Sequence, residues 1–196
     1  MPSEPALLPS PRLIRDAKVF SWLACLCLVV TLAIDLWQVG ALAFRSHGAG
    51  LMHGSFAFNL DLGWLGMVDA PDPAFVPIDH FTLSQSLLCT ALLALRLLPG
   101  LVILWCRARL FGTYGRGDVF TARNTRCMRT IAWALVAYAA VPLVTHAGLF
   151  AASLSEVPVR LEVRQLDALV AGLILLALAR VMSFGCAIDE DRQGFV

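Results

Sequence analysis

The chain has 196 residues, of which 59% are hydrophobic and only 15% are charged, and its net charge at pH 7 is +1. Soluble globular chains average about 45–50% apolar and about 25% charged residues, so this composition excludes an ordinary water-soluble domain. It indicates a membrane protein whose surroundings are the lipid bilayer, and a net charge so close to zero predicts no direct binding of nucleic acid.

Four apolar stretches reach the length of about 20 residues that a bilayer-spanning helix needs. They are residues 19–44, 83–106, 128–153 and 165–188. Residues 1–18 form a proline-rich tail, and no small-residue cleavage site follows the first apolar run, so we expect the first helix to be retained. The sequence therefore predicts an all-α membrane protein. Its transmembrane domain covers residues 19–188, between a cytoplasmic N-terminal tail and a cytoplasmic acidic tail at 189–196.

The loop after the first span contains an alternating stretch, residues 55–64 (SFAFNLDLGW), with a large apolar side chain at every second position. This is the period of a β-strand with one apolar face. The run at 157–164 (VPVRLEVR), between the third and fourth spans, alternates in the same way. Because an isolated strand leaves its backbone groups unpaired, we predict that these runs form a small two-stranded extracytoplasmic β element. The alternative is an aromatic loop whose Phe56, Phe58 and Trp64 enter the headgroup region.

Two ionisable residues fall inside predicted spans, where charges are costly and usually face the interior of the bundle. They are Asp35 in the first span and Arg96 in the second. The helix rise of about 1.5 Å per residue places them within about 10 Å of each other in depth, which predicts an intramembrane polar pair. The pair either locks the first two helices together or belongs to a polar path for protons or ions. Pro99 and Gly100, just beyond Arg96, are expected to kink the second helix.

The loop between the second and third spans is the most patterned polar segment. Thr121 has the position of an N-cap for a helix that begins at Ala122, and arginines then recur at i, i+3 and i+6 as a basic stripe. We define a candidate cytoplasmic interaction surface as Arg116, Phe120, Thr121, Arg123, Asn124, Arg126 and Arg129. Topology and contact with lipid headgroups would explain the stripe, and so would docking of an acidic protein or lipid.

Lys and Arg concentrate before the first span, between the second and third, and after the fourth. These residues are Arg12, Arg15, Lys18, Arg107, Arg109, Arg116, Arg123, Arg126, Arg129 and Arg192. Because positively charged loops stay in the cytoplasm, both termini are predicted to be cytoplasmic. Arg180, in the inner part of the fourth span, lies within snorkelling reach of the same headgroups.

Catalytic and metal-binding patterns are missing from the sequence. It has no nucleophile motif, phosphate loop, paired carboxylates or Cys-x-x-Cys pair, so we expect no enzyme, cofactor or metal site. His146 in the third span has no second histidine nearby, which favours a hydrogen-bonded bundle residue. The histidines of the first outer loop, His47, His53 and His80, leave a zinc site open as an alternative.

Two short motifs resemble one family of bacterial membrane proteins. The first is the loop pattern Gly117-x-x-Phe120-Thr121, then Asn124, then Met128-Arg129-x-Ile131. The second is the C-terminal stretch LVAGLILLALARVMSFGCAIDEDRQGFV. Both are similar to the family catalogued as domain of unknown function 2975. The tail departs from the family pattern, because residues 189–195 (DEDRQGF) stand where its members tend to have Glu-rich residues followed by Thr-Val.

The resemblance implies a four-helix protein of the bacterial inner membrane without enzymatic activity. Many such proteins are encoded beside a small helix-turn-helix regulator, so it further implies a role as the membrane partner of such a cytoplasmic regulator. The alternative is a small transporter or an accessory subunit with a polar path at Asp35 and Arg96. The spacings Gly148-x-x-x-Ala152 and Ala168-x-x-x-Gly172 permit close helix contact within the chain or between chains, which leaves a homo-oligomer open.

Overall fold

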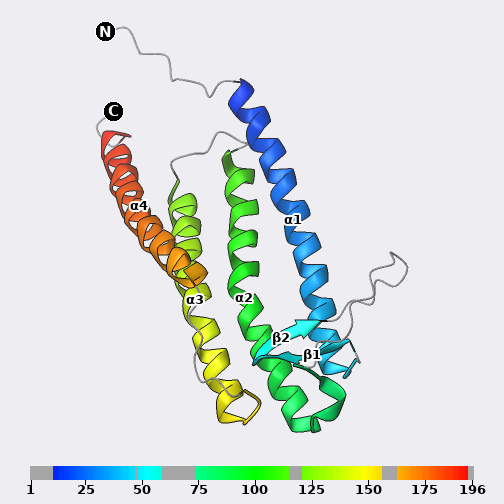
Figure 1. Cartoon of the computed structure of the whole chain (residues 1–196). Coiled ribbons are helices and arrows are strands. Elements are labelled where there is room, and N and C mark those ends of the chain that lie inside the picture. Colours follow the sequence, from blue (N-terminus) through cyan, green and yellow to red (C-terminus); the bar gives the residue numbers. More distant parts are fainter. Residues whose placement is uncertain (1–10, 47, 59–73, 115–120, 156–162, 194–196) are drawn as a thin grey trace, which may run out of the picture. The chain divides into compact units, whose positions relative to one another are not determined.

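The computed structural model describes residues 11–46, 48–58, 74–114, 121–155 and 163–193. Within them, the long helices are α1 (Pro11–Ala43), α2 (Leu83–Tyr114), α3 (Ala122–Ala151) and α4 (Val163–Gln193) (Figure 1). Each contains a segment long and apolar enough to cross a membrane. The predicted four-helix composition is thus confirmed, although the helices extend beyond the apolar stretches, for example where α1 begins at Pro11 and α2 continues to Tyr114.

A small antiparallel sheet follows α1. Its strands are β1 (Ala49–Met52), β2 (Ser55–Phe58) and β3 (Phe75–Pro77), in the order β2-β1-β3. Leu51 of β1 is opposite Phe56 on one side and Val76 on the other. β1 is therefore the central strand, and all the strands that the structure describes come from the segment between α1 and α2.

The predicted two-stranded element is corrected by this topology. The strand begins at Ser55 as expected, but its neighbour is β1 in the same loop, and the sheet has three strands instead of two. Residues 59–64 and 157–162 lie outside the described residues, whereas Val163 and Arg164 open helix α4. The local partner is available because His53 and Gly54 both have positive φ (49° and 74°), as a tight two-residue hairpin turn requires.

The chain divides into two compact units. We call Thr31–Pro99 with Ala137–Asp167 the sheet unit, and Met1–Val30, Gly100–Val136 and Ala168–Val196 the turn unit. Each long helix contributes one segment to each unit. Helix α2 continues through Pro99, which is the last residue of its sheet-unit segment.

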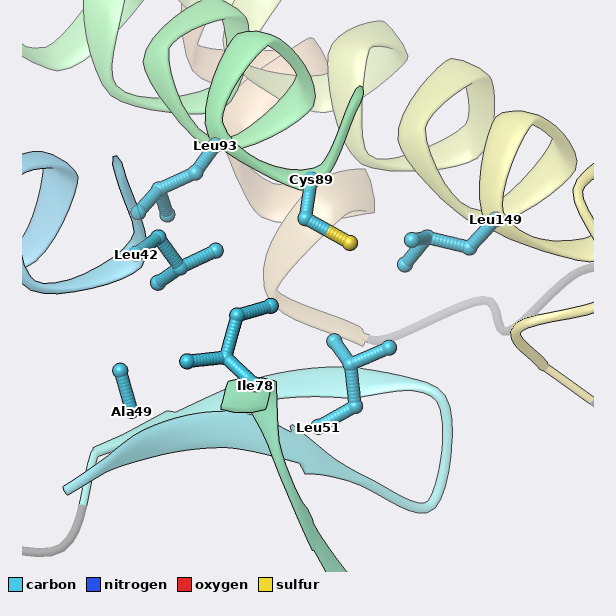
Figure 2. Close-up of a cluster of buried hydrophobic side chains, with 7 residues drawn as sticks. All are labelled: Leu42, Ala49, Leu51, Ile78, Cys89, Leu93 and Leu149. Carbon is cyan, nitrogen blue, oxygen red and sulfur yellow. The ribbon is translucent and has the colours of Figure 1, made fainter. Parts of the chain in front are cut away.

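A cluster of buried apolar side chains holds the sheet unit together (Figure 2). It joins the sheet to the ends of three helices and to the short 3-10 helix η2 (Ile78–His80). Its members are Leu42, Ala49, Leu51, Ile78, Cys89, Leu93 and Leu149. Burying these side chains against one another is the main stabilising contribution that we assign to this unit.

Polar contacts fix the entry into α2. The Arg45 guanidinium donates to the carbonyl oxygen of Asp79 (2.7 Å) and to that of Phe81. Thr82 and Gln85 form a reciprocal capping box, in which the Thr82 amide donates to Oε1 of Gln85 (2.9 Å) and the Gln85 amide donates to Oγ1 of Thr82 (3.4 Å). These bonds satisfy amides that would otherwise have no acceptor and explain why α2 begins at Leu83.

Close helix packing at the small-residue motifs occurs within the chain. In the turn unit, a Cβ at Gly172 of α4 would lie 3.0 Å from the carbonyl oxygen of Ala132 in α3. In the sheet unit, a Cβ at Gly148 of α3 would lie 3.2 Å from the Leu92 side chain. Both glycines therefore allow neighbouring helices to approach closely, and association between copies of the chain stays a prediction.

Candidate functional site

The start of α3 is built as its sequence predicts. Thr121 precedes the helix, and the amide of Asn124 donates to its hydroxyl oxygen at 3.3 Å. The amide of Thr125 donates to the Thr121 carbonyl at 3.1 Å. Thr121 is therefore the N-cap, and the prediction that the helix begins at Ala122 is confirmed.

Asn124 lies inside the protein and not on its surface. It is 0% exposed, and the Thr113 hydroxyl at the end of α2 lies 2.7 Å from its Oδ1. The same hydroxyl lies 2.7 Å from the Leu110 carbonyl oxygen, so its single proton is shared between two acceptors. Asn124 thus ties the beginning of α3 to the end of α2 and supports the turn from within.

The arginines of the stripe are available to a partner. Arg123, Arg126 and Arg129 are all exposed on the first two turns of α3, and none of them has an ion-pair partner among the residues that the structure describes. We call these three residues the basic row. Thr121 beside them is half-buried, while Arg116 and Phe120 lie outside the described residues.

A cavity of about 480 Å³ adjoins the basic row in the turn unit. It lies between α3 and α4 and is lined by Thr125, Arg129, Trp133, Leu173, Leu176, Ala177, Ala179, Arg180 and Ser183. Arg129 and Arg180, which the sequence analysis treated separately, thus line the same cavity. A lining that combines apolar side chains with two arginines suits a ligand with an anionic group and a hydrocarbon part.

Sequence reasoning missed Trp133 and Ser183 as parts of this cavity. Thr125, Arg129 and Trp133 follow one another at intervals of four residues, which places them on one face of α3. Trp133 is 59% exposed, in the manner of an aromatic residue that lies at a membrane interface. The spacing was a usable signal, but it does not indicate which face of α4 lies opposite.

The structure does not join Asp35 to Arg96. Asp35 is 9% exposed on α1 and Arg96 is half-buried on α2, and no ion pair between them occurs among the described interactions. Arg96 instead lines a separate small cavity with Tyr138 and Arg164. The roles suggested for Asp35 and Arg96 remain predictions.

The histidines are dispersed in the part of the chain that is described. His146 is buried in α3, whereas His53 and His80 are exposed in the sheet unit, and His47 lies outside the described residues. In the described ranges, no group of three or more His, Cys, Asp or Glu side chains could hold a metal ion.

Replacing Thr113 by valine is expected to destabilise the turn unit by about 1–3 kcal/mol, because one hydrogen bond to the buried Asn124 is lost at nearly constant volume. Thermal unfolding of the purified full-length protein in detergent would measure the loss. Thr130→Val is the matched control, since that exposed hydroxyl bonds only to the Arg126 carbonyl of its own helix. Equal melting temperatures for the two variants would contradict the role given to Asn124.

A comparison with known families gives one match. The model of the family described as "Protein of unknown function (DUF2975)" matches residues 61–193, which include α2, α3 and α4. No curated protein and no solved structure matches the chain.

Proposed function

The chain belongs to the family of proteins of unknown function DUF2975, and from this premise we propose that it is a non-enzymatic interaction protein of the bacterial inner membrane. In this proposal the four helices, which are long and apolar enough to do so, cross the bilayer, and both termini and the basic row face the cytoplasm. The partner is a small helix-turn-helix transcription regulator, which the protein holds at the membrane and away from DNA.

The observation that carries the proposal is the basic row, which is exposed and has no ion-pair partner among residues 121–155 and the other described ranges. Arg123, Arg126 and Arg129 project from a helix start that is fixed by the Thr121 cap and by the buried Asn124. Charges on a rigid element can steer an acidic surface into one orientation, which favours specific docking. The orientation is supported by the accumulation of Lys and Arg on the side of the basic row.

A regulator can be held in this way without competing with its DNA. Its DNA-binding face is basic and would be repelled by the row, so docking must use an acidic face elsewhere on the regulator. Attachment to a membrane protein then removes the regulator from the nucleoid. The binding energy is electrostatic in this arrangement, so affinity should fall as salt rises.

The test is binding of full-length protein in nanodiscs of uncharged lipid to each purified helix-turn-helix regulator encoded in neighbouring genes. We expect the double variant Arg123→Gln/Arg126→Gln to weaken binding about tenfold or more and to reduce its salt dependence. The control Lys18→Gln/Arg107→Gln removes the same charge from two other exposed residues of the turn unit and should bind normally.

Three results would contradict the proposal. Equal losses in both double variants would indicate a general charge effect. Binding that requires anionic lipid in the nanodisc would indicate that the row serves headgroup contact alone. A single cysteine introduced at position 126 of a cysteine-free variant must also react with a membrane-impermeant probe only from the cytoplasmic side.

A further inference from the structure

The sheet unit contains a cavity of about 130 Å³, which is smaller than the cavity described above in the turn unit. Three helices contribute to it: Arg96 and Leu97 from α2, Tyr138 and Pro142 from α3, and Arg164 and Gln165 from the first turn of α4. Ligand sites for organic molecules usually occupy about 300–1,000 Å³, so this cavity has the size for one small polar group.

Arg96 brings a charge into this cavity far from the helix ends. It is the fourteenth residue of α2, so the rise of about 1.5 Å per residue places it about 20 Å from Leu83 along the helix axis. The side chain is half-buried and has neither a hydrogen bond nor an ion pair within the described part of the chain. A cation in an apolar span is costly unless a counter-ion or water reaches it, so Arg96 calls for a ligand of opposite charge.

Gln165 is a second group without a partner. Its side chain is only 7% exposed, and its Oε1 has no hydrogen-bond partner among the described residues. Buried polar atoms in folded proteins are nearly always hydrogen-bonded, so each exception needs an explanation. Because a carboxamide offers both an acceptor oxygen and a donor nitrogen, Gln165 can contact either a bare or a protonated oxygen of a ligand.

The start of α4 adds positive potential to the same place. The first amides of a helix have no carbonyl acceptor within it, and the helix dipole is positive at this end. The first turn of α4 contains no acidic residue, and none of the residues that line the cavity is acidic. Two arginines, a tyrosine, a glutamine and a helix start therefore border one cavity, and no acidic residue is among the described residues that line it.

From this arrangement, we propose that the cavity between Arg96, Tyr138, Arg164 and Gln165 binds one phosphate-type oxyanion. Arg96 and Arg164 would hold its oxygens by charge-assisted and bidentate hydrogen bonds, for which guanidinium geometry is suited. Tyr138 and Gln165 would contact the remaining oxygens. The same chemistry is presented by free inorganic phosphate and by the headgroup of a phospholipid, and the experiment separates these two sources.

The experiment uses the full-length protein, purified in an uncharged detergent. One arm measures the melting temperature during a titration with sodium phosphate, against sodium chloride at equal ionic strength. The other arm counts the phospholipids that remain bound to the protein in native mass spectrometry, after incubation with phosphatidylglycerol. Each arm compares wild type with Arg96→Gln, Arg164→Gln and Gln165→Leu.

Arg180→Gln is the control, because it removes an arginine of the same helix from a different cavity. Because Arg164 is exposed, its replacement should leave the fold intact. The site can therefore be tested with Arg164→Gln even if Arg96→Gln lowers the yield. We expect a saturable effect in wild type and in the control, and a loss of affinity of about tenfold or more in the cavity variants.

Saturation by free phosphate identifies a soluble anion as the ligand, and retention of phosphatidylglycerol without a phosphate effect identifies a lipid headgroup. Either result supports the site, provided that Arg164→Gln weakens the effect about tenfold or more and Arg180→Gln does not. If Arg164→Gln and Gln165→Leu behave as wild type in both arms, or if Arg180→Gln loses as much, the proposal is overturned.

Discussion

Replacing Gly50 by valine is expected to prevent assembly of the sheet unit. Gly50 lies in the central strand β1, and a Cβ built there meets the carbonyl oxygen of Val76 and the Phe75 ring of the neighbouring strand. The backbone oxygen belongs to the β1–β3 pairing and cannot move away without breaking it. We expect a loss of at least about 3 kcal/mol, at the upper end of the penalties for overpacking, and a fall in the yield of monodisperse protein.

The matched control for Gly50→Val is Gly40→Ala in the same unit. Gly40 lies in helix α1 with nothing within 4 Å of an added Cβ, and alanine favours helix by about 0.5–1 kcal/mol over glycine. This variant should melt at the same or a higher temperature. A Gly50→Val protein that elutes and melts as wild type would show that β1 and β3 are not paired in this register.

Truncation of Ile78 to alanine is expected to cost about 2–5 kcal/mol, the range for removing a buried aliphatic side chain and leaving a cavity. Ile78 is fully buried in the cluster that joins the sheet to α1, α2 and α3. Because the side chain comes from η2 and not from a long helix, its loss should loosen the sheet more than the spans. Thermal unfolding, with hydrogen exchange of the β1 amides, would measure both effects.

The neighbouring Val76→Ala variant is the control for Ile78→Ala. Val76 is 43% exposed on β3, so its truncation removes little buried surface and should cost less than about 1 kcal/mol. Comparable losses at both positions, or faster exchange throughout α2 and α3 in Ile78→Ala, would mean that the cluster is not a separate core of the sheet unit.

The four helices could be predicted because membrane-spanning length and apolarity are local properties of a sequence. Their ends were harder to place. Helix α2 extends past the arginines at 107 and 109 to Tyr114, where apolarity has ended but helix formation has not. Arg109 remains near the apolar surface there, with its guanidinium 5.9 Å from the Trp105 ring centre. Hydropathy indicates where a helix leaves an apolar environment and not the residue at which the helix ends.

The sheet shows a different limit. Alternation revealed the strand at Ser55–Phe58, but the central strand β1 (AGLM) is too short and too uniformly apolar to alternate, so its partner was sought in a distant loop. A strand that is covered over its length carries little period-2 signal. The turn at His53–Gly54 was the feature that could have indicated the local hairpin.

The candidate site was predicted where the chemistry is local. The Thr121 cap follows from three residues of sequence, and the basic row follows from helical spacing. The burial of Asn124 and the meeting of Arg129 with Arg180 could not be derived in this way, because each depends on which faces of two helices meet. Polar residues in a basic segment look alike in sequence whether they face solvent or a neighbouring helix.

The described strands all lie within residues 49–77, and this bears on the order in which the chain can be assembled during synthesis. All three strands, and η2 after them, are complete before α3 begins to emerge from the ribosome. Local pairings close quickly because little loop entropy is lost, and domains generally form from the N-terminal side during translation. The first two helices and their sheet can therefore form an early nucleus. Leu149, near the end of α3, is the last member of the cluster to be synthesised. The cluster is therefore complete only when α3 has packed against the first half of the chain.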